Sequence, residues 1–82
     1  MARVFCAGQE FRALTGGLDT LDVPAAGLRA LLAELDRRFP GVRDHVDEKM
    51  AVAIDGEIHQ DALDVPLEPD SEVVLIPRIA GG

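Results

Sequence analysis

The feature that most constrains the fold is a single amphipathic segment over residues 24–39, with strand-like segments on both sides of it. Its apolar side chains recur at the spacing of a helix. They are Leu28, Leu31, Leu32, Leu35 and Phe39. Pro24 can occupy the first turn, and Pro40-Gly41 is a stop signal. We therefore expect one helix that lays an apolar stripe on a sheet.

Two strand-like segments precede this helix. Residues Arg3 to Ala7 have the alternation of a short strand, which places Val4 and Cys6 on one face and Phe5 on the other. Thr15-Gly16-Gly17 predicts a turn, and residues 18–23 then form a returning strand. The first part of the chain is therefore predicted to be a hairpin.

A second strand pair follows the helix. Residues 42–49 are polar and predict a loop with a short helical turn at 43–46. Residues 50–54 read as a strand with Val52 and Ile54 facing inward. Asp55-Gly56 then favours a two-residue hairpin turn into a short strand over residues 57–59.

The chain closes with a turn-rich segment over residues 66–71 and a last strand over residues 72–79. Because the helix supplies the long connection that parallel pairing needs, the first and last strands can lie side by side in parallel. The order is strand, strand, helix, strand, short strand, strand. This predicts an α+β fold of the β-grasp, or ubiquitin-like, class, with one main helix and a mixed sheet of four to five strands. We expect all 82 residues to form one domain with a flexible tail at 80–82.

Alternation along the last strand predicts an exposed apolar patch. The charged ends mark one face as outward: Glu72, Val74, Ile76 and Arg78 share it, whereas Val73, Leu75 and Ile79 face inward. The same parity puts Phe5 outward, beside Ile76 if the two strands pair, and Ile58 extends the group. Such a cluster on an uncovered sheet indicates a docking surface.

The composition argues against several classes of function. The net charge is −7, and the chain has no clustered basic residues and no Tyr or Trp, which disfavours nucleic acid as a partner. Cys6 is the only cysteine, so an internal disulfide and a multi-cysteine metal or iron–sulfur site are excluded. With no apolar run of membrane-spanning length and no signal-peptide core, we expect a cytoplasmic protein that does not bind membranes.

No residue group predicts an active site within the domain. Cys6 has the parity of a buried residue, and His45 and His59 have no catalytic neighbours at convincing spacing. The acidic residues are expected to be solvated rather than to bind a metal; those with the closest spacing are Asp44, Asp47, Glu48, Asp61 and Asp64. We expect no catalytic residue, no metal and no bound cofactor.

The terminal Ala80-Gly81-Gly82 is the remaining candidate. Glycine has no Cβ, so such a tail can enter a narrow tunnel and present its carboxylate to a reactive centre. A terminus with accidental glycines is the simpler alternative.

Taken together, these segments resemble the MoaD/ThiS family of ubiquitin-like sulfur carriers, which includes the small subunit of molybdopterin synthase. The residues that carry the resemblance are Val4-Phe5, Leu28-Arg29-Ala30-Leu31-Leu32, Arg38-Phe39-Pro40-Gly41, Val52-Ala53-Ile54-Asp55-Gly56, Pro66-Leu67, residues 71–77 and Gly81-Gly82. They are spread over essentially the whole chain.

The resemblance implies a mechanism and partners. A ubiquitin-activating-like adenylating enzyme uses ATP to activate the Gly82 carboxylate, a sulfur donor enzyme converts it to a thiocarboxylate, and an acceptor enzyme receives the sulfur. Gly81 and Ala80 serve as the spacer, and Phe5, Ile58 and Ile76 match the family's docking patch. We add Val74, Arg78 and Ile79 to the predicted docking residues.

The resemblance favours the molybdopterin-synthase large subunit as the acceptor. Pro77 is followed by Arg78 where molybdopterin-type carriers have a second proline, and the ending also resembles carriers that supply a cysteine synthase. Carriers for cysteine or thiamine biosynthesis, a modifier that forms isopeptide bonds through Gly82, and a binding module with an inert tail remain the alternatives.

Overall fold

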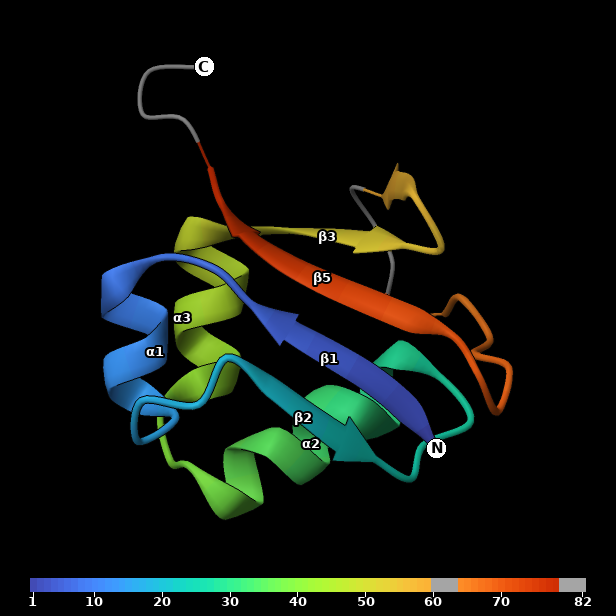
Figure 1. Ribbon diagram of the computed structural model, residues 1–82, viewed down its shortest axis with the longest axis horizontal. Coiled ribbons are helices and arrows are strands. Elements are labelled where there is room, and N and C mark those ends of the chain that lie inside the picture. The colour runs from blue at the N-terminus through green and yellow to red at the C-terminus, as the bar shows by residue number, and fades with distance from the viewer. Residues whose placement is uncertain (60–63, 79–82) are drawn as a thin grey trace.

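A computed structural model describes residues 1–59 and 64–78 (Figure 1). In this part of the chain, five strands form one sheet in the order β2-β1-β5-β3-β4. The strands are β1 (Ala2–Cys6), β2 (Thr20–Val23), β3 (Met50–Ile54), β4 (Glu57–His59) and β5 (Glu72–Pro77). The helices are α1 (Gln9–Leu14), α2 (Leu28–Arg38) and α3 (Val42–Lys49). The mixed sheet confirms the predicted β-grasp class.

The centre of the sheet is the predicted parallel pair. β1 and β5 run in the same direction, with Val4 opposite Val73 and Cys6 opposite Leu75. β2 pairs antiparallel with β1, and β3 pairs antiparallel with both β5 and β4. The pleat therefore places Val4, Cys6, Val73 and Leu75 on one face, and all four are buried.

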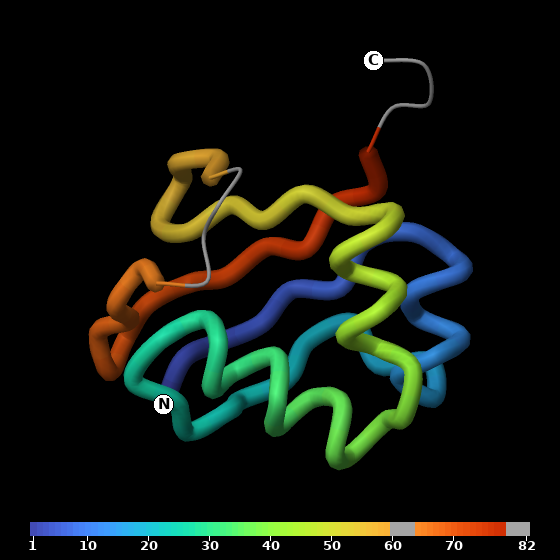
Figure 2. Tube along the Cα trace, turned by 180° about the vertical axis from the view of Figure 1, so that it is seen from behind, coloured from blue at the N-terminus to red at the C-terminus, as the bar shows by residue number. Residues whose placement is uncertain are grey.

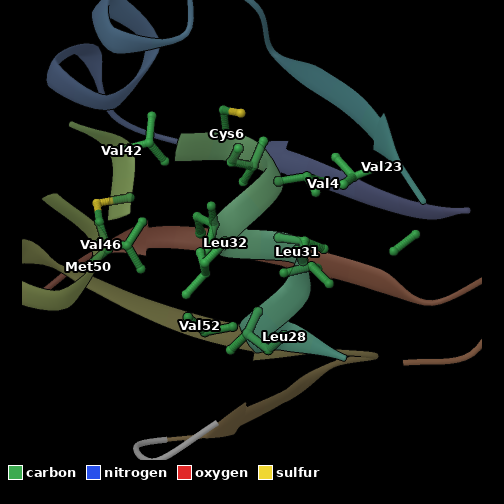
Figure 3. Close-up of a cluster of buried hydrophobic side chains, with 14 of the residues drawn as sticks. Val4, Cys6, Val23, Leu28, Leu31, Leu32, Val42, Val46, Met50 and Val52 are labelled. Atoms are coloured by element: carbon green, nitrogen blue, oxygen red, sulfur yellow. The ribbon is translucent and has the colours of Figure 1, made fainter. Parts of the chain in front are cut away.

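One face of this sheet is covered by helices. Figure 2 shows α2 and α3 in front of the strands, and Figure 1 shows the sheet from its other side. The predicted stripe of α2 supplies four leucines that are each at most 1% exposed: Leu28, Leu31, Leu32 and Leu35. Figure 3 shows Leu28, Leu31 and Leu32 packed between the inner residues of β1 and β3, and Leu35 belongs to the same buried cluster. This single layer of apolar side chains is the core.

The prediction of a first hairpin is wrong in one respect, because an additional helix lies between its two strands. α1 lies between β1 and β2, so the two strands pair as expected but are not joined by a tight turn. Phe11, in the middle of α1, is 1% exposed and anchors the helix to the core. Six residues are too few to show a helical period in the sequence, and a helix this short depends on tertiary contacts.

Two further predictions need correction. α2 begins at Leu28 rather than at Pro24, because Gly27 is its N-cap and the Leu28 N–H donates to the Val65 carbonyl at 3.3 Å. Residues 42–49 form the complete helix α3 rather than a loop with a short turn. Val42 and Val46 lie one turn apart and are both buried, which explains why this polar segment is helical.

The predicted turn at Asp55-Gly56 is confirmed. Asp55 has φ +49° and Gly56 has φ +87°, as a two-residue type I′ hairpin requires. The Asp55 carboxylate also accepts hydrogen bonds from the Ser71 hydroxyl at 3.2 Å and from the Glu72 N–H at 2.9 Å. These bonds fix the start of β5 against the end of β3.

Candidate functional site

The outer face of the sheet carries the predicted apolar patch, which comprises Phe5, Ile58, Val74 and Ile76. Phe5 lies opposite Val74, Val74 opposite Ala53, and Ala53 opposite Ile58, so a continuous apolar row crosses four strands. Ile58 is 68% exposed, and the other three members of the patch are half-buried. No described helix covers this face in the views of Figures 1 and 2. The patch is therefore accessible to a partner.

The register corrects one detail of the patch. Phe5 is opposite Val74, and Ile76 is opposite Ala51, one pleat further along β5. Phe5 and Ile76 are therefore diagonal neighbours rather than a direct pair. The half-burial of Val74 and Ile76, which were expected to be exposed, follows from their position on the central strand β5.

Charged side chains occupy the other end of the same face. Arg3 lies opposite both Asp22 and Glu72, and its guanidinium pairs with the Asp22 carboxylate at 3.3 Å. Because β5 runs from this charged end toward Ile76, the patch lies at the end from which the chain leaves toward its C-terminus. A partner seated on the patch would therefore be next to the tail.

The last described residues are held firmly to α3. The Arg78 N–H donates to the Lys49 carbonyl at 2.8 Å, which extends the pairing of β5 with β3. The Arg78 guanidinium donates to the Asp47 carbonyl, one of the carbonyls that α3 leaves unpaired at its C-terminal end. Arg78 was predicted to dock a partner, but the structure directs its side chain to α3 rather than to the apolar patch.

Gly8 holds the opposite side of the tail's base. Its φ is +92°, and a Cβ at this position would lie 2.7 Å from Cγ of Pro77. The position therefore requires glycine both for its backbone conformation and for the close approach of β5. Gly8 was not predicted from the sequence. The only indication of its role there is that a glycine directly follows the first predicted strand. Together, Gly8, Lys49 and Asp47 fix Pro77 and Arg78; we call this set the tail clamp.

The remaining candidates inside the domain have structural surroundings. Cys6 is buried as predicted, and burial raises the pKa of its thiol, which keeps it protonated and unreactive. His45 was expected on a surface loop; it lies on α3, half-buried and stacked on Phe11 with ring centroids 5.9 Å apart. His59 is half-buried on β4, opposite Val52.

The described residues contain neither a metal-binding cluster nor a membrane-spanning helix. In residues 1–59 and 64–78, no three His, Cys, Asp or Glu side chains are grouped so that they could hold a metal ion. None of the helices in the same two ranges has the length and apolarity needed to cross a membrane. Four predicted site residues lie outside the described residues: Ile79, Ala80, Gly81 and Gly82. Asp61, which was expected to be solvated, lies outside them as well.

Solved structures share this fold over nearly the whole chain. CysO from Mycobacterium tuberculosis superimposes with a TM-score of 0.84 at 14% identity, over 96% of this chain and 100% of that one. Small archaeal modifier protein 1 (SAMP1) from Methanosarcina acetivorans gives a TM-score of 0.80 at 18% identity, over 99% and 95% of the two chains. A chain in the complex of molybdopterin-converting factor subunits 1 and 2 from Helicobacter pylori gives a TM-score of 0.58 at 21% identity, over 99% of this chain and 97% of that one. At these identities the matches establish the fold.

Sequence comparison assigns the family. No curated protein matches the chain significantly. A model of the ThiS family matches residues 9–82, which is most of the chain and includes the terminal glycines. The protein therefore belongs to the ThiS family, within the MoaD/ThiS group of ubiquitin-like sulfur carriers.

Proposed function

We propose that this protein is a sulfur carrier whose Gly82 carboxylate is adenylated, converted to a thiocarboxylate and used to deliver sulfur to an acceptor enzyme. The observation that carries the proposal is the tail clamp. It fixes Pro77 and Arg78 at the end of a central strand, directly before a sequence that is small enough to enter a tunnel. In this proposal the catalytic groups are supplied by the partner enzymes.

The chemistry needs a partner because a carboxylate is a poor electrophile. A carboxylate oxygen of Gly82 attacks the α-phosphorus of ATP and pyrophosphate leaves, which gives an acyl-adenylate. Hydrosulfide from a sulfur donor then attacks the carbonyl carbon, the bond to the AMP oxygen breaks, and AMP leaves with the electron pair. The product is a thiocarboxylate, whose sulfur is the nucleophile that the acceptor enzyme uses.

The apolar patch suits the adenylating enzyme as the first partner. It lies at the end of the outer face from which β5 leaves toward the tail. It combines the exposed Ile58 with three half-buried apolar side chains, and it has a charged rim at Arg3 and Glu72. Interfaces of this kind have an apolar centre and a polar border. The same surface is available to an acceptor enzyme after sulfur has been loaded, so the two partners would bind in turn.

The pathway is proposed from the relatives. The sequence favoured the large subunit of molybdopterin synthase as the acceptor, and a related complex of subunits 1 and 2 supports that choice. The backbone agrees better with CysO, at a TM-score of 0.84 against 0.58, so a cysteine synthase is the second acceptor to test. The likeness to SAMP1 favours a modifier function as the alternative to sulfur transfer.

Intact-mass spectrometry tests the proposal. The full chain is incubated with the adenylating enzyme of the same source, ATP and sulfide, and a variant that lacks Gly82 serves as the control. We expect the mass of the full chain to rise by the difference between one sulfur and one oxygen atom. The mass of the variant that lacks Gly82 should not change. Adducts to lysine side chains without any thiocarboxylate would establish the modifier function instead. An unchanged mass with active enzyme, and no lysine-linked adducts when the reaction is repeated in cell extract, would refute both functions.

A further inference from the structure

A recess lies beside the tail's base, on the side opposite to the apolar patch. It is formed where the start of α1, the end of α3 and the ends of β3 and β5 meet, and its volume is about 360 Å³. Figures 1 and 2 both show α1 and α3 side by side at this end of the sheet. The residues that matter for its chemistry are Phe11, His45, Lys49, Met50, Pro77 and Arg78.

The recess combines apolar and cationic groups. Met50 and Pro77 lie opposite each other on the inner face of the sheet, and Phe11 stacks on His45 beside them. Among the described residues, Lys49 has no carboxylate oxygen within 4.0 Å of its ammonium group, and Arg78 is already bound to the end of α3. In a chain of net charge −7, Lys49 is thus a cation without a partner in the described structure.

Glu10 limits where an anion can bind in the recess. It lies at the start of α1 and also lines the recess, so its carboxylate would repel an incoming anion on that wall. The Lys49 ammonium, on the far wall, is the group that attracts an anion. The expected occupant therefore places a carboxylate against this ammonium and an apolar group over Met50 and Pro77.

The length of the tail brings a partner to this recess. Four residues follow Arg78, and a fully extended chain spans at most about 3.6 Å per residue, so Gly82 can reach about 14 Å from the tail clamp. For the carboxylate to enter a reaction centre, the partner must close on the base of the tail. It then meets the apolar patch on one face of β5 and the recess on the other.

We infer that the recess is a second docking site for the adenylating enzyme, and that it receives a loop carrying a carboxylate next to an apolar side chain. The carboxylate pairs with Lys49, and the apolar side chain packs on Met50 and Pro77. The inference rests on the proposed function, because it takes the enzyme that accepts the tail as the occupant. It adds a binding surface that is separate from the apolar patch.

The test compares two α3 residues with the same charge. Lys49→Met and Arg43→Met each remove one cation, and neither Lys49 nor Arg43 has a carboxylate within 4.0 Å among the described residues. Arg43 does not line the recess. Pyrophosphate release by the adenylating enzyme is measured as a function of carrier concentration. Lys49→Met should raise the KM for the carrier about three- to fivefold with kcat unchanged, because uniform binding is lost. Arg43→Met should change the KM by less than about twofold, and Lys49→Arg should restore the wild-type value.

The outcomes separate this inference from the proposed function. Equal effects of Lys49→Met and Arg43→Met would show that net charge alone matters and would overturn the inference. A wild-type KM for Lys49→Met would overturn it as well, while adenylation of the wild type would still support the proposed function. Absence of adenylation in the wild type would refute both. Urea unfolding of each variant confirms that the fold is intact.

Discussion

Replacing Gly8 with alanine adds one methyl group at the point where the chain leaves β1 and touches Pro77. The backbone there has φ +92° and ψ +141°, a region that residues with a Cβ rarely occupy. The added Cβ would also lie 2.7 Å from Cγ of Pro77, well inside van der Waals contact. The substitution therefore strains α1 and β5 at once.

The cost has two parts. Holding a residue with a Cβ in this backbone region costs about 1–3 kcal/mol. Forcing an extra carbon into a packed contact costs a further ~1–3 kcal/mol. Gly8→Ala should therefore lower the free energy of unfolding by about 2–6 kcal/mol. A domain of 82 residues has a total of about 4–12 kcal/mol, so the variant is expected to be close to unfolding.

Urea unfolding followed by circular dichroism measures this loss, because the chain has no Trp or Tyr for fluorescence. Gly17→Ala is the control for a glycine at positive φ: Gly17 has φ +87° and no atom lies within 4 Å of an added Cβ, so that variant carries a backbone cost without a steric contact. Pro77→Ala removes the atoms that clash. In a double-mutant cycle, it should recover about 1–3 kcal/mol of the Gly8→Ala loss. The reasoning is refuted if Gly8→Ala and Gly17→Ala lose the same free energy, or if Pro77→Ala recovers none of it.

Three further predictions concern other parts of the molecule. Asp55→Ala should lower the free energy of unfolding by about 1–2 kcal/mol, because two hydrogen-bond donors at the start of β5 lose their acceptor; Asp55→Asn, which keeps one acceptor, should lose less in the same urea assay. Hydrogen bonds from Arg37 and Arg38 lower the pKa of Glu34 to about 2. The contribution of the Glu34 carboxylate to stability should therefore be complete above its usual pKa of about 4.3 and disappear as the pH falls through about 2. The free energies of unfolding of wild type and Glu34→Gln should accordingly converge in acid. A difference in free energy that does not change with pH would contradict this. Ile76→Asp should weaken binding to the adenylating enzyme at least about tenfold, measured by calorimetry, with little loss of stability; a variant that unfolds would show that Ile76 belongs to the core.

Much of the sheet could be predicted because alternation along a strand records its two faces. Val4 and Cys6 in β1 and Val73 and Leu75 in β5 keep strict period two, and burial separates them from Phe5 and Val74 as expected. The parallel pairing followed from the helix between the two halves of the chain. The members of the apolar patch could therefore be identified before the register of the strands was known.

The short helices could not be predicted because their stability comes from distant contacts. α3 has only two valines in eight residues, and α1 is held by Phe11, so neither segment shows a periodic pattern. The tail clamp and the recess depend on these helices. Gly8 and Pro77, or Lys49 and Arg78, are far apart in the sequence, and no local pattern indicates that they meet.

The parallel pairing of the two end strands has a mechanical consequence. β1 and β5 are joined along their length, with the Arg3 N–H bonded to the Ser71 carbonyl at 2.9 Å and the Ala7 N–H bonded to the Leu75 carbonyl at 3.2 Å. Because both strands run the same way, a pull on the N-terminus against the C-terminus slides them past each other and loads all these bonds together. Strands that were pulled apart from one end would lose the same bonds one at a time. A load applied between the two ends of the described chain is therefore shared by several hydrogen bonds of the central strand pair.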